Sequence, residues 1–167
     1  MRLSWLMAAG LALGWASPAL ARCPAPLSAG TPPVKGQHVF CGEVRRDGKA
    51  TGFHSRPGGV NPASVSGTDD VRPDPRRPGI YTLFRFRISE HGQTAVKTIS
   101  TMFPDHCDEA GVIAAIQNAY RTGTREDRSF SGLSGPSCED GNGNPFRIQG
   151  FTGTYNGRMV IITAYPN

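Results

Sequence analysis

The sequence predicts an α+β fold in a single domain, with mainly antiparallel sheet built from hairpins and packed with one or two helices. Three observations lead to this fold class. Segments with the alternation of strands come in pairs joined by turn dipeptides, one segment has the periodicity of an amphipathic helix, and the strands cluster instead of alternating with helices. A chain of 167 residues is long enough for one domain with a hydrophobic core.

The first 21 residues have the pattern of a signal peptide. Arg2 precedes a mostly apolar run, and Ala19-Leu20-Ala21 supplies the small residues that signal peptidase accepts. A membrane anchor is the alternative, but a helix needs about 20 apolar residues to cross a bilayer and this run ends at Ser17-Pro18. We therefore expect a cleaved leader over 1–21, an N-terminal extension over 22–35, a main domain over 36–167, and a periplasmic or secreted protein.

Four cysteines follow the leader: Cys23, Cys41, Cys107 and Cys138. An even number in an exported chain favours disulfides, and pairing Cys23 with Cys41 and Cys107 with Cys138 would close a short loop in each case. A zinc site is the alternative, but no pair has the Cys-x-x-Cys or Cys-x-x-His spacing of metal ligands. We therefore expect two disulfides and no metal site.

The charge is modestly basic. The net charge is +5, and removal of Arg2 with the leader leaves 5 − 1 = +4, a balance that suits a polyanionic partner such as RNA. The sequence lacks the paired-carboxylate motif and the nucleophile motif of a peptidoglycan or protein hydrolase. The loop Gly141-Asn142-Gly143-Asn144 lacks the Lys-Ser or Lys-Thr ending of a nucleotide-phosphate loop.

Two hairpins are predicted in the first half of the chain. Asp47-Gly48 joins a strand over 37–44 to a strand over 49–54, and His91-Gly92 joins a strand over 80–88 to a strand over 94–102. Between the hairpins, residues 56–79 are rich in proline and glycine and predict a long surface loop. The side chains expected on one face of the third strand are Ile80, Thr82, Phe84, Phe86 and Ile88, with Arg85 and Arg87 on the other.

A helix and a final hairpin are predicted in the second half. Asp105 is the expected cap of the helix, and Gly123 is its expected end. Residues 124–145 predict a loop, and Asn156-Gly157 joins a strand over 146–155 to a strand over 158–165. The apolar stripe of the helix consists of Val112, Ile113, Ile116, Ala119 and Tyr120.

Two of the four histidines, His38 and His54, fall on the two arms of the first predicted hairpin, which would bring them close together. RNA cleavage by internal transfer needs such a pair, because one imidazole takes the proton of the ribose 2′-hydroxyl and the other protonates the departing 5′-oxygen. Lys97 lies on a strand that could pack beside the hairpin and supply a cation for the transition state. Ordinary surface histidines are the alternative reading of the spacing alone.

Four segments resemble, in the same order, the motifs of EndoU endoribonucleases. Gly36 to Val44 (GQHVFCGEV) and Gly48 to His54 (GKATGFH) are similar to the two histidine motifs of the family, HVFxGE and GKxxGFH. Lys97 to Phe103 (KTISTMF) resembles the lysine strand, and the helical segment over 104–120 resembles the helix that follows it. The ending Thr163-Ala164-Tyr165-Pro166 resembles the terminal Thr-x-Tyr motif. The cysteines and the leader depart from the family pattern.

The resemblance covers residues 36–167 and implies an EndoU-like fold and a uridylate-preferring endoribonuclease that leaves 2′,3′-cyclic phosphate ends. It implies His54 as general base, His38 as general acid and Lys97 as the stabilising cation, with the assignment of acid and base left open. The uracil-binding residues that it implies are Thr163 and Tyr165, and we expect Thr101, four residues after Lys97, to add a second hydroxyl to that pocket. No cofactor is required, and the family resemblance allows stimulation by Mn²⁺. The expected partners are single-stranded RNA and, if the protein is a toxin, an immunity or inhibitor protein; we expect a monomer.

An alternative function is a non-catalytic exported module that uses the same fold to bind RNA or another polyanion. The simultaneous presence of both histidines, the lysine, Thr163 and Tyr165 argues against this alternative, because loss of catalysis would be expected to erase at least one of them. Tyr165 also has an alternative reading as a core residue, and Thr101 as an ordinary strand residue. Arg56 is a candidate phosphate contact, whereas His91 and His106 match no motif.

Overall fold

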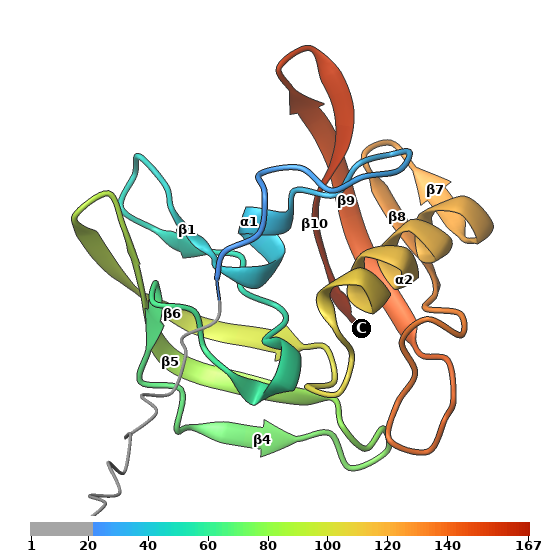
Figure 1. Cartoon of the computed structure of the whole chain (residues 1–167), viewed down its shortest axis with the longest axis horizontal. Coiled ribbons are helices and arrows are strands. Elements are labelled where there is room, and N and C mark those ends of the chain that lie inside the picture. The colour runs from blue at the N-terminus through green and yellow to red at the C-terminus, as the bar shows by residue number, and fades with distance from the viewer. Residues whose placement is uncertain (1–21) are drawn as a thin grey trace, which may run out of the picture.

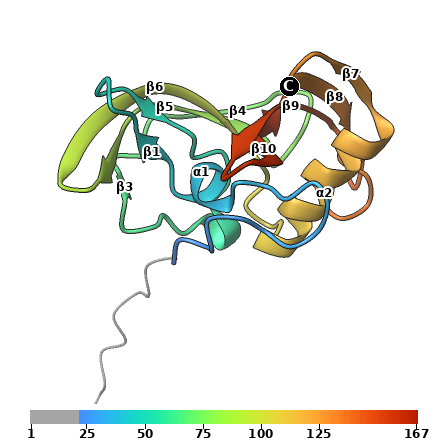
Figure 2. The ribbon, with the colours of Figure 1, turned by 90° about the horizontal axis from the view of Figure 1, so that it is seen from above.

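Each half of the chain forms a four-stranded antiparallel sheet. This computed structural model describes residues 22–167, so the predicted signal peptide lies outside the described residues. The sheet that contains β4 to β6 lies at the lower left of Figure 1, and the sheet of β7 to β10 lies at the right, with the helix α2 in front of it. Figure 2 shows both sheets above α1 and α2. The arrangement confirms the predicted α+β class.

The first half contains α1 (Gly36–Phe40), β1 (Glu43–Val44), β2 (Ala50–Thr51), the 3-10 helix η1 (Pro57–Gly59), β3 (Val65–Ser66), β4 (Val71–Pro73), β5 (Tyr81–Glu90) and β6 (Gln93–Met102). The second half contains α2 (Glu109–Thr122), β7 (Thr124–Glu126), β8 (Ser129–Leu133), β9 (Arg147–Tyr155) and β10 (Arg158–Pro166). β5 pairs with β3, β4 and β6, the second sheet has the order β10-β9-β8-β7, and β1 pairs with β2. The hairpins predicted at His91-Gly92 and Asn156-Gly157 are confirmed.

The prediction of a strand over 37–44 was wrong for its first part, where Gly36–Phe40 forms the short helix α1. The alternation of polar and apolar residues indicated a strand, yet the neighbours Val39 and Phe40 are both buried in the core. The peptide N–H of Cys41 donates to the carbonyl of Gln37 at 2.9 Å, which closes a helical turn. Over so few residues, packing decides the conformation and periodicity does not. The first hairpin is therefore reduced to β1 and β2, and neither histidine lies on a strand.

The long strands β5 and β6 change the face that they turn inward half-way along their length. Leu83 and Ser100 form a cross-strand pair in which both residues are buried. The next inward-facing pair joins the buried Phe86 to the half-buried Lys97. Between these pairs the inward phase shifts by one residue in both strands, at the exposed Arg85, which has a φ of 48°, and Thr98. The prediction of one continuous face from Ile80 to Ile88 was therefore wrong. Its side chains divide at the shift: Phe86 and Ile88 are buried with Tyr81 and Leu83, whereas Thr82 and Phe84 lie on the opposite, outer face.

Both segments predicted to be loops contain short strands. β3 and β4 pair with β5, and β7 and β8 extend the sheet of β9 and β10. The glycine within β8 obscured this strand in the sequence. A Cβ at Gly132 would lie 2.2 Å from the carbonyl oxygen of Ala119, so α2 packs directly on the backbone of β8. Glycine here marks a close approach of two backbones and not a loop.

The predicted helix is confirmed as α2, but its N-cap is Asp108 and not Asp105. The carboxylate of Asp108 accepts the peptide N–H of Gly111 at 2.7 Å. Asp105 instead accepts hydrogen bonds from the hydroxyl of Tyr81 and the guanidinium of Arg56. The whole predicted stripe faces the main core, with Val112, Ile116 and Ala119 fully buried and Ile113 and Tyr120 packed against them.

Both predicted disulfides are confirmed. Cys23–Cys41 joins the N-terminal extension to the residue that ends α1, and Cys107–Cys138 joins the segment before α2 to the loop after β8. Two disulfides are typical of proteins that fold outside the reducing cytoplasm. Within residues 22–167, no helix combines the length and apolar character that a membrane span requires.

Candidate active site

Backbone hydrogen bonds bring the two predicted histidines together. The peptide N–H groups of Phe53 and His54 donate to the carbonyl oxygens of His38 and Val39, at 2.8 and 2.6 Å. The imidazole centroids of His38 and His54 are consequently 6.4 Å apart, with an interplanar angle of 35°. Both residues are buried, with 8% and 7% of their surface exposed. The separation of the two rings is one that a single phosphodiester group can span.

A glycine makes this approach of the two segments possible. Gly52 has a φ of 75°, and a Cβ at this position would lie 2.2 Å from the carbonyl oxygen of His38. Any side chain would therefore displace α1 and strain the backbone. This requirement gives a physical reason for the glycine that immediately precedes Phe53 and His54 in the sequence GFH.

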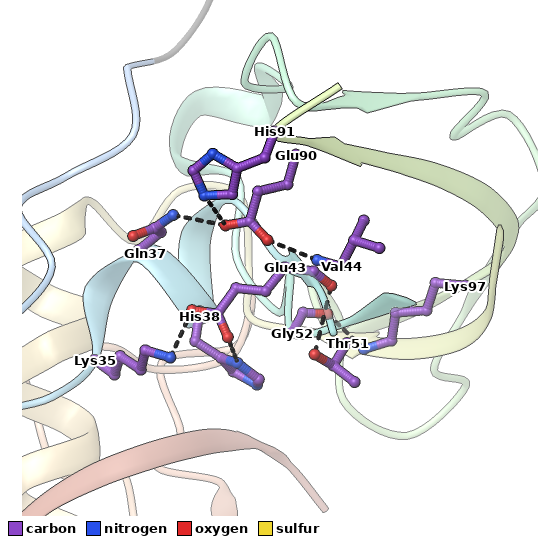
Figure 3. Close-up of polar contacts among 10 residues, drawn as sticks. All are labelled: Lys35, Gln37, His38, Glu43, Val44, Thr51, Gly52, Glu90, His91 and Lys97. Atoms are coloured by element: carbon purple, nitrogen blue, oxygen red, sulfur yellow. Dashed lines mark hydrogen bonds and ion pairs between the residues drawn. The ribbon is translucent and has the colours of Figure 1, made fainter. Parts of the chain in front are cut away.

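A carboxylate holds the first histidine. Glu43 of β1 accepts a hydrogen bond from Nδ1 of His38 at 3.0 Å and forms an ion pair with Lys35 at 2.7 Å (Figure 3). Burial raises the pKa of Glu43, but the hydrogen bonds and positive charges of His38 and Lys35 outweigh it and lower the pKa to about 2. The carboxylate is therefore ionised at neutral pH and fixes the ring with Nε2 as its free nitrogen.

A second carboxylate anchors the element that carries His38. Glu90, at the end of β5, accepts the side-chain amide of Gln37 at 3.0 Å and the peptide N–H of Val44 at 2.8 Å (Figure 3). These bonds tie α1 and β1 to the long strand. The position of His38 thus depends on β1, which contributes Glu43, and on β5, which contributes Glu90.

Neutral acceptors hold the second histidine. Nδ1 of His54 lies 2.9 Å from Oγ of Ser100 and 3.2 Å from the carbonyl oxygen of Thr101. The hydroxyl of Ser100 donates to the carbonyl of Phe53 at 2.6 Å, so its oxygen is left to accept from the imidazole. Both neighbours are therefore acceptors, which places the proton of a neutral His54 on Nδ1. Nε2 then carries the lone pair that can take a proton.

Lys97 lies close enough to act on His54 electrostatically. Burial, followed by the positive charges of Lys97 and His38, lowers the pKa of His54 well below its ordinary value. The ammonium of Lys97 donates to the carbonyl of Gly52, the residue that leads into Phe53 and His54 (Figure 3). Burial lowers the pKa of Lys97 to about 8, so it is mostly charged at neutral pH. The site thus joins a neutral imidazole to a nearby cation.

The three predicted uracil-binding residues are placed at the junction of the two sheets. The ring centroid of Tyr165 is 5.2 Å from that of His54. Thr101 and Tyr165 line a common hollow of about 310 Å³. Thr101 lies on the outer face of β6, opposite the face of Lys97, because the strand changes its inward phase between them. The hydroxyl of Thr163 is buried and has no hydrogen-bond partner within the described residues.

The family model of the bacterial EndoU nucleases matches residues 34–167. The chain belongs to this family. The match covers most of the chain, and it assigns a nuclease domain to the protein. Neither the curated proteins nor the solved structures contain a match to the chain. The match to the EndoU nucleases begins at Val34, which is fully buried and bridges to Ile161 of β10.

Two residues of this EndoU domain were missed by the sequence analysis. Glu43 is the last residue of the segment HVFCGE, so its place within a histidine motif could have identified it. Ser100 could not have been found in this way, because its contact with His54 depends on the shift of phase in β6.

Other polar residues of the EndoU domain have structural partners. Arg56, the candidate phosphate contact, donates to the hydroxyl of Tyr81 at 2.6 Å and pairs with Asp105 at 3.4 Å. His106 bonds to the carbonyl of Glu139 at 3.1 Å, and His91 lies at the tip of the β5–β6 hairpin. Within residues 22–167, no group of three or more histidines, cysteines or acids is arranged to hold a metal ion.

Proposed function

We propose that this protein is an exported endoribonuclease that cleaves single-stranded RNA after uridine by attack of the ribose 2′-hydroxyl. The observation that carries the proposal is the unlike surroundings of two imidazoles whose centroids are 6.4 Å apart. His38 faces a carboxylate, whereas Nδ1 of His54 faces neutral acceptors. Acid–base catalysis of phosphodiester transfer needs two such groups in different protonation states.

In the proposed reaction, Nε2 of His54 takes the proton of the 2′-hydroxyl, and the 2′-oxygen attacks the adjacent phosphorus. The bond from phosphorus to the 5′-oxygen breaks, and His38 donates a proton to that oxygen. The products are a 2′,3′-cyclic phosphate and a free 5′-hydroxyl. Lys97 stabilises the negative charge of the transition state as a point charge.

Glu43 supports the role of His38 as the acid. The acid must carry a positive charge before it donates its proton, and the ionised Glu43 compensates this charge. His54 supports the role of base, because its lowered pKa keeps it neutral and its Nδ1 partners leave Nε2 unprotonated. This assignment agrees with the one that the family resemblance implies.

Tyr165, Thr101 and Thr163 support a preference for uridine. Tyr165 can stack on a pyrimidine beside His54, and threonine hydroxyls can bond the edge of uracil. Export is supported by the two disulfides and by the leader pattern over 1–21. We further propose that an exported nuclease of this kind acts as a toxin restrained by an immunity or inhibitor protein.

The test uses oxidised protein and a short RNA that contains one uridine. We expect one cut, a 2′,3′-cyclic phosphate on the uridine fragment by mass spectrometry, and full activity in a chelator, because the nucleophile is the 2′-hydroxyl and not a metal-bound water. Replacement of the target uridine by deoxyuridine removes the nucleophile and should abolish cleavage. His54→Ala should lower kcat about 10²- to 10⁴-fold. Cleavage of the deoxyuridine strand, or full activity of His54→Ala, would refute the mechanism.

A further inference from the structure

The hollow that Thr101 and Tyr165 share opens onto the outer face of the first sheet. Arg72 of β4, Thr82 of β5 and Thr101 of β6 are register partners and form a row across three strands. The same three residues line the hollow of about 310 Å³ beside Tyr165. The floor of the hollow therefore continues across the sheet, away from the histidines.

A second row on this face is apolar and exposed. Phe84 and Ile99 are register partners, and Ile99 is 56% exposed. Cζ of Arg72 lies 5.0 Å from the ring centroid of Phe84, so the guanidinium covers one side of the half-buried ring. Phe84 thus lies between the guanidinium of Arg72 on β4 and the exposed Ile99 on β6, and the three side chains form a surface on which a flat group can stack.

The charge of Arg72 is not compensated. Among the ion pairs of residues 22–167 there is none to Arg72, while the neighbouring acids Asp70 and Asp74 pair with Arg85 and Arg77. All three residues of β4 are exposed, and in Figure 2 α1 lies below this sheet while α2 lies below the second sheet. The face is therefore open, apolar in part, and positively charged next to the proposed base site.

We propose that this face, which we name the Arg72 platform (Arg72, Thr82, Phe84 and Ile99), binds a nucleotide that flanks the cleaved uridine in single-stranded RNA. The inference rests on the proposed function and extends it to a second nucleotide. The guanidinium of Arg72, with one side on Phe84, offers its other side to a base and its N–H groups to a phosphate. Unpaired bases are free to stack on such a surface, whereas the bases of a duplex are not.

The test compares Arg72→Ala with the wild type on two substrates: a uridine 3′-phosphate ester of 4-nitrophenol, which has no flanking nucleotide, and a single-stranded RNA that contains one uridine. Arg72 is exposed, so the substitution is compatible with folding. We expect kcat/KM on the RNA to fall about 10-fold more than on the ester, mainly through KM. The slope of log(kcat/KM) against log salt should become shallower by about 1.

A matched control lies in the second sheet. Arg125 of β7 is exposed, and its Cζ lies 5.1 Å from the ring centroid of Tyr120, nearly the same geometry as Arg72 over Phe84. Arg125→Ala removes the same charge and the same type of stacking contact at a distance from the hollow. It should leave the ratio of the two kcat/KM values unchanged. Ile99→Ser should lower that ratio in the same direction as Arg72→Ala, but by less.

The outcomes separate the platform from the proposed function. Equal losses on both substrates, or no loss in Arg72→Ala, would overturn the platform while the nuclease stands. A wild type that cleaves neither substrate would overturn the nuclease, and the platform is then tested by fluorescence anisotropy with the deoxyuridine strand, where equal affinities of wild type and Arg72→Ala count against it. A concentration-dependent dimer that Ile99→Ser dissociates would assign the face to a second copy and also overturn the platform.

Discussion

The surroundings of His38 and His54 differ in charge and in hydrogen-bond partners. His38 lies on a helix and bonds to a carboxylate that itself has a lysine partner. His54 lies on an irregular segment, bonds to a hydroxyl and a peptide carbonyl, and is close to the positive charge of Lys97. Motif resemblance identifies both rings equally well. The difference between their partners, which only the fold reveals, is the basis of the roles proposed for them.

The largest expected effects come from the two histidines, and the leaving group distinguishes them. On RNA, His38→Ala and His54→Ala should each lower kcat about 10²- to 10⁴-fold. A uridine 3′-phosphate ester of 4-nitrophenol has a leaving group that needs no proton, so it should restore activity to His38→Ala and not to His54→Ala. The measurement is nitrophenolate release for each variant. Rescue of His54→Ala instead would exchange the two roles.

The next largest effect on activity is expected for substitution of Glu43. A hydrogen bond to a charged group contributes about 1.5–3 kcal/mol, so Glu43→Gln should lower kcat on RNA about 10- to 100-fold. The nitrophenyl ester should show a much smaller effect, because Glu43 acts through the acid. A loss of equal size on both substrates would mean that Glu43 only maintains the fold, and thermal unfolding of the variant provides an independent control.

The pH profile tests the cation near His54. Lys97 is charged below its lowered pKa of about 8 and loses its charge as the pH rises through this value. At pH 9 only about one molecule in ten retains the charge, so Lys97 should contribute an alkaline decline in kcat. Lys97→Arg keeps its charge at every accessible pH, and its profile should lack this contribution although its activity at neutral pH is lower. Identical alkaline limbs in the two proteins would argue against a role for the ammonium.

Ser100 should have the smallest effect. Ser100→Ala removes one of the two acceptors at Nδ1 of His54, and the carbonyl of Thr101 keeps the tautomer. A neutral hydrogen bond contributes about 1 kcal/mol, so we expect kcat to fall about 5-fold. The loss should appear on both RNA and the nitrophenyl ester, since Ser100 acts through the base. The converse pattern, with a loss on RNA alone, would connect Ser100 to the acid.

Much of the fold could be predicted from local sequence patterns that are compatible with only one type of structure. Asn156-Gly157 and His91-Gly92 determine two hairpins, and the stripe from Val112 to Tyr120 determines α2. Elements shaped by distant contacts could not be predicted. The first part of the strand predicted over 37–44 forms a helix instead, in which Val39 and Phe40 are both buried and the carbonyls of His38 and Val39 receive the peptide groups of residues 53 and 54.

The residues of the candidate site also divide into those that the sequence predicts and those that only the structure reveals. The residue types at His38, His54 and Lys97 are visible in the sequence, and the structure brings the two imidazoles close together, with Lys97 bonded to the carbonyl of Gly52, two residues before His54. Their partners depend on geometry that no local pattern encodes. Glu43 reaches His38 because α1 turns toward β1, and Ser100 reaches His54 because β6 presents a different face there than at Thr98.

Because of the shift of phase at Arg85 and Thr98, β6 presents Lys97 and Thr101 on opposite faces. In a regular strand Lys97 and Thr101 would share a side, so the ammonium and the threonine hydroxyl would point into the same space. Here the ammonium faces the interior, and the threonine opens outward onto the hollow beside Tyr165. Deleting one residue at this point would exchange inside for outside along half the hairpin, whereas the exposed tip at His91-Gly92 should tolerate changes in length.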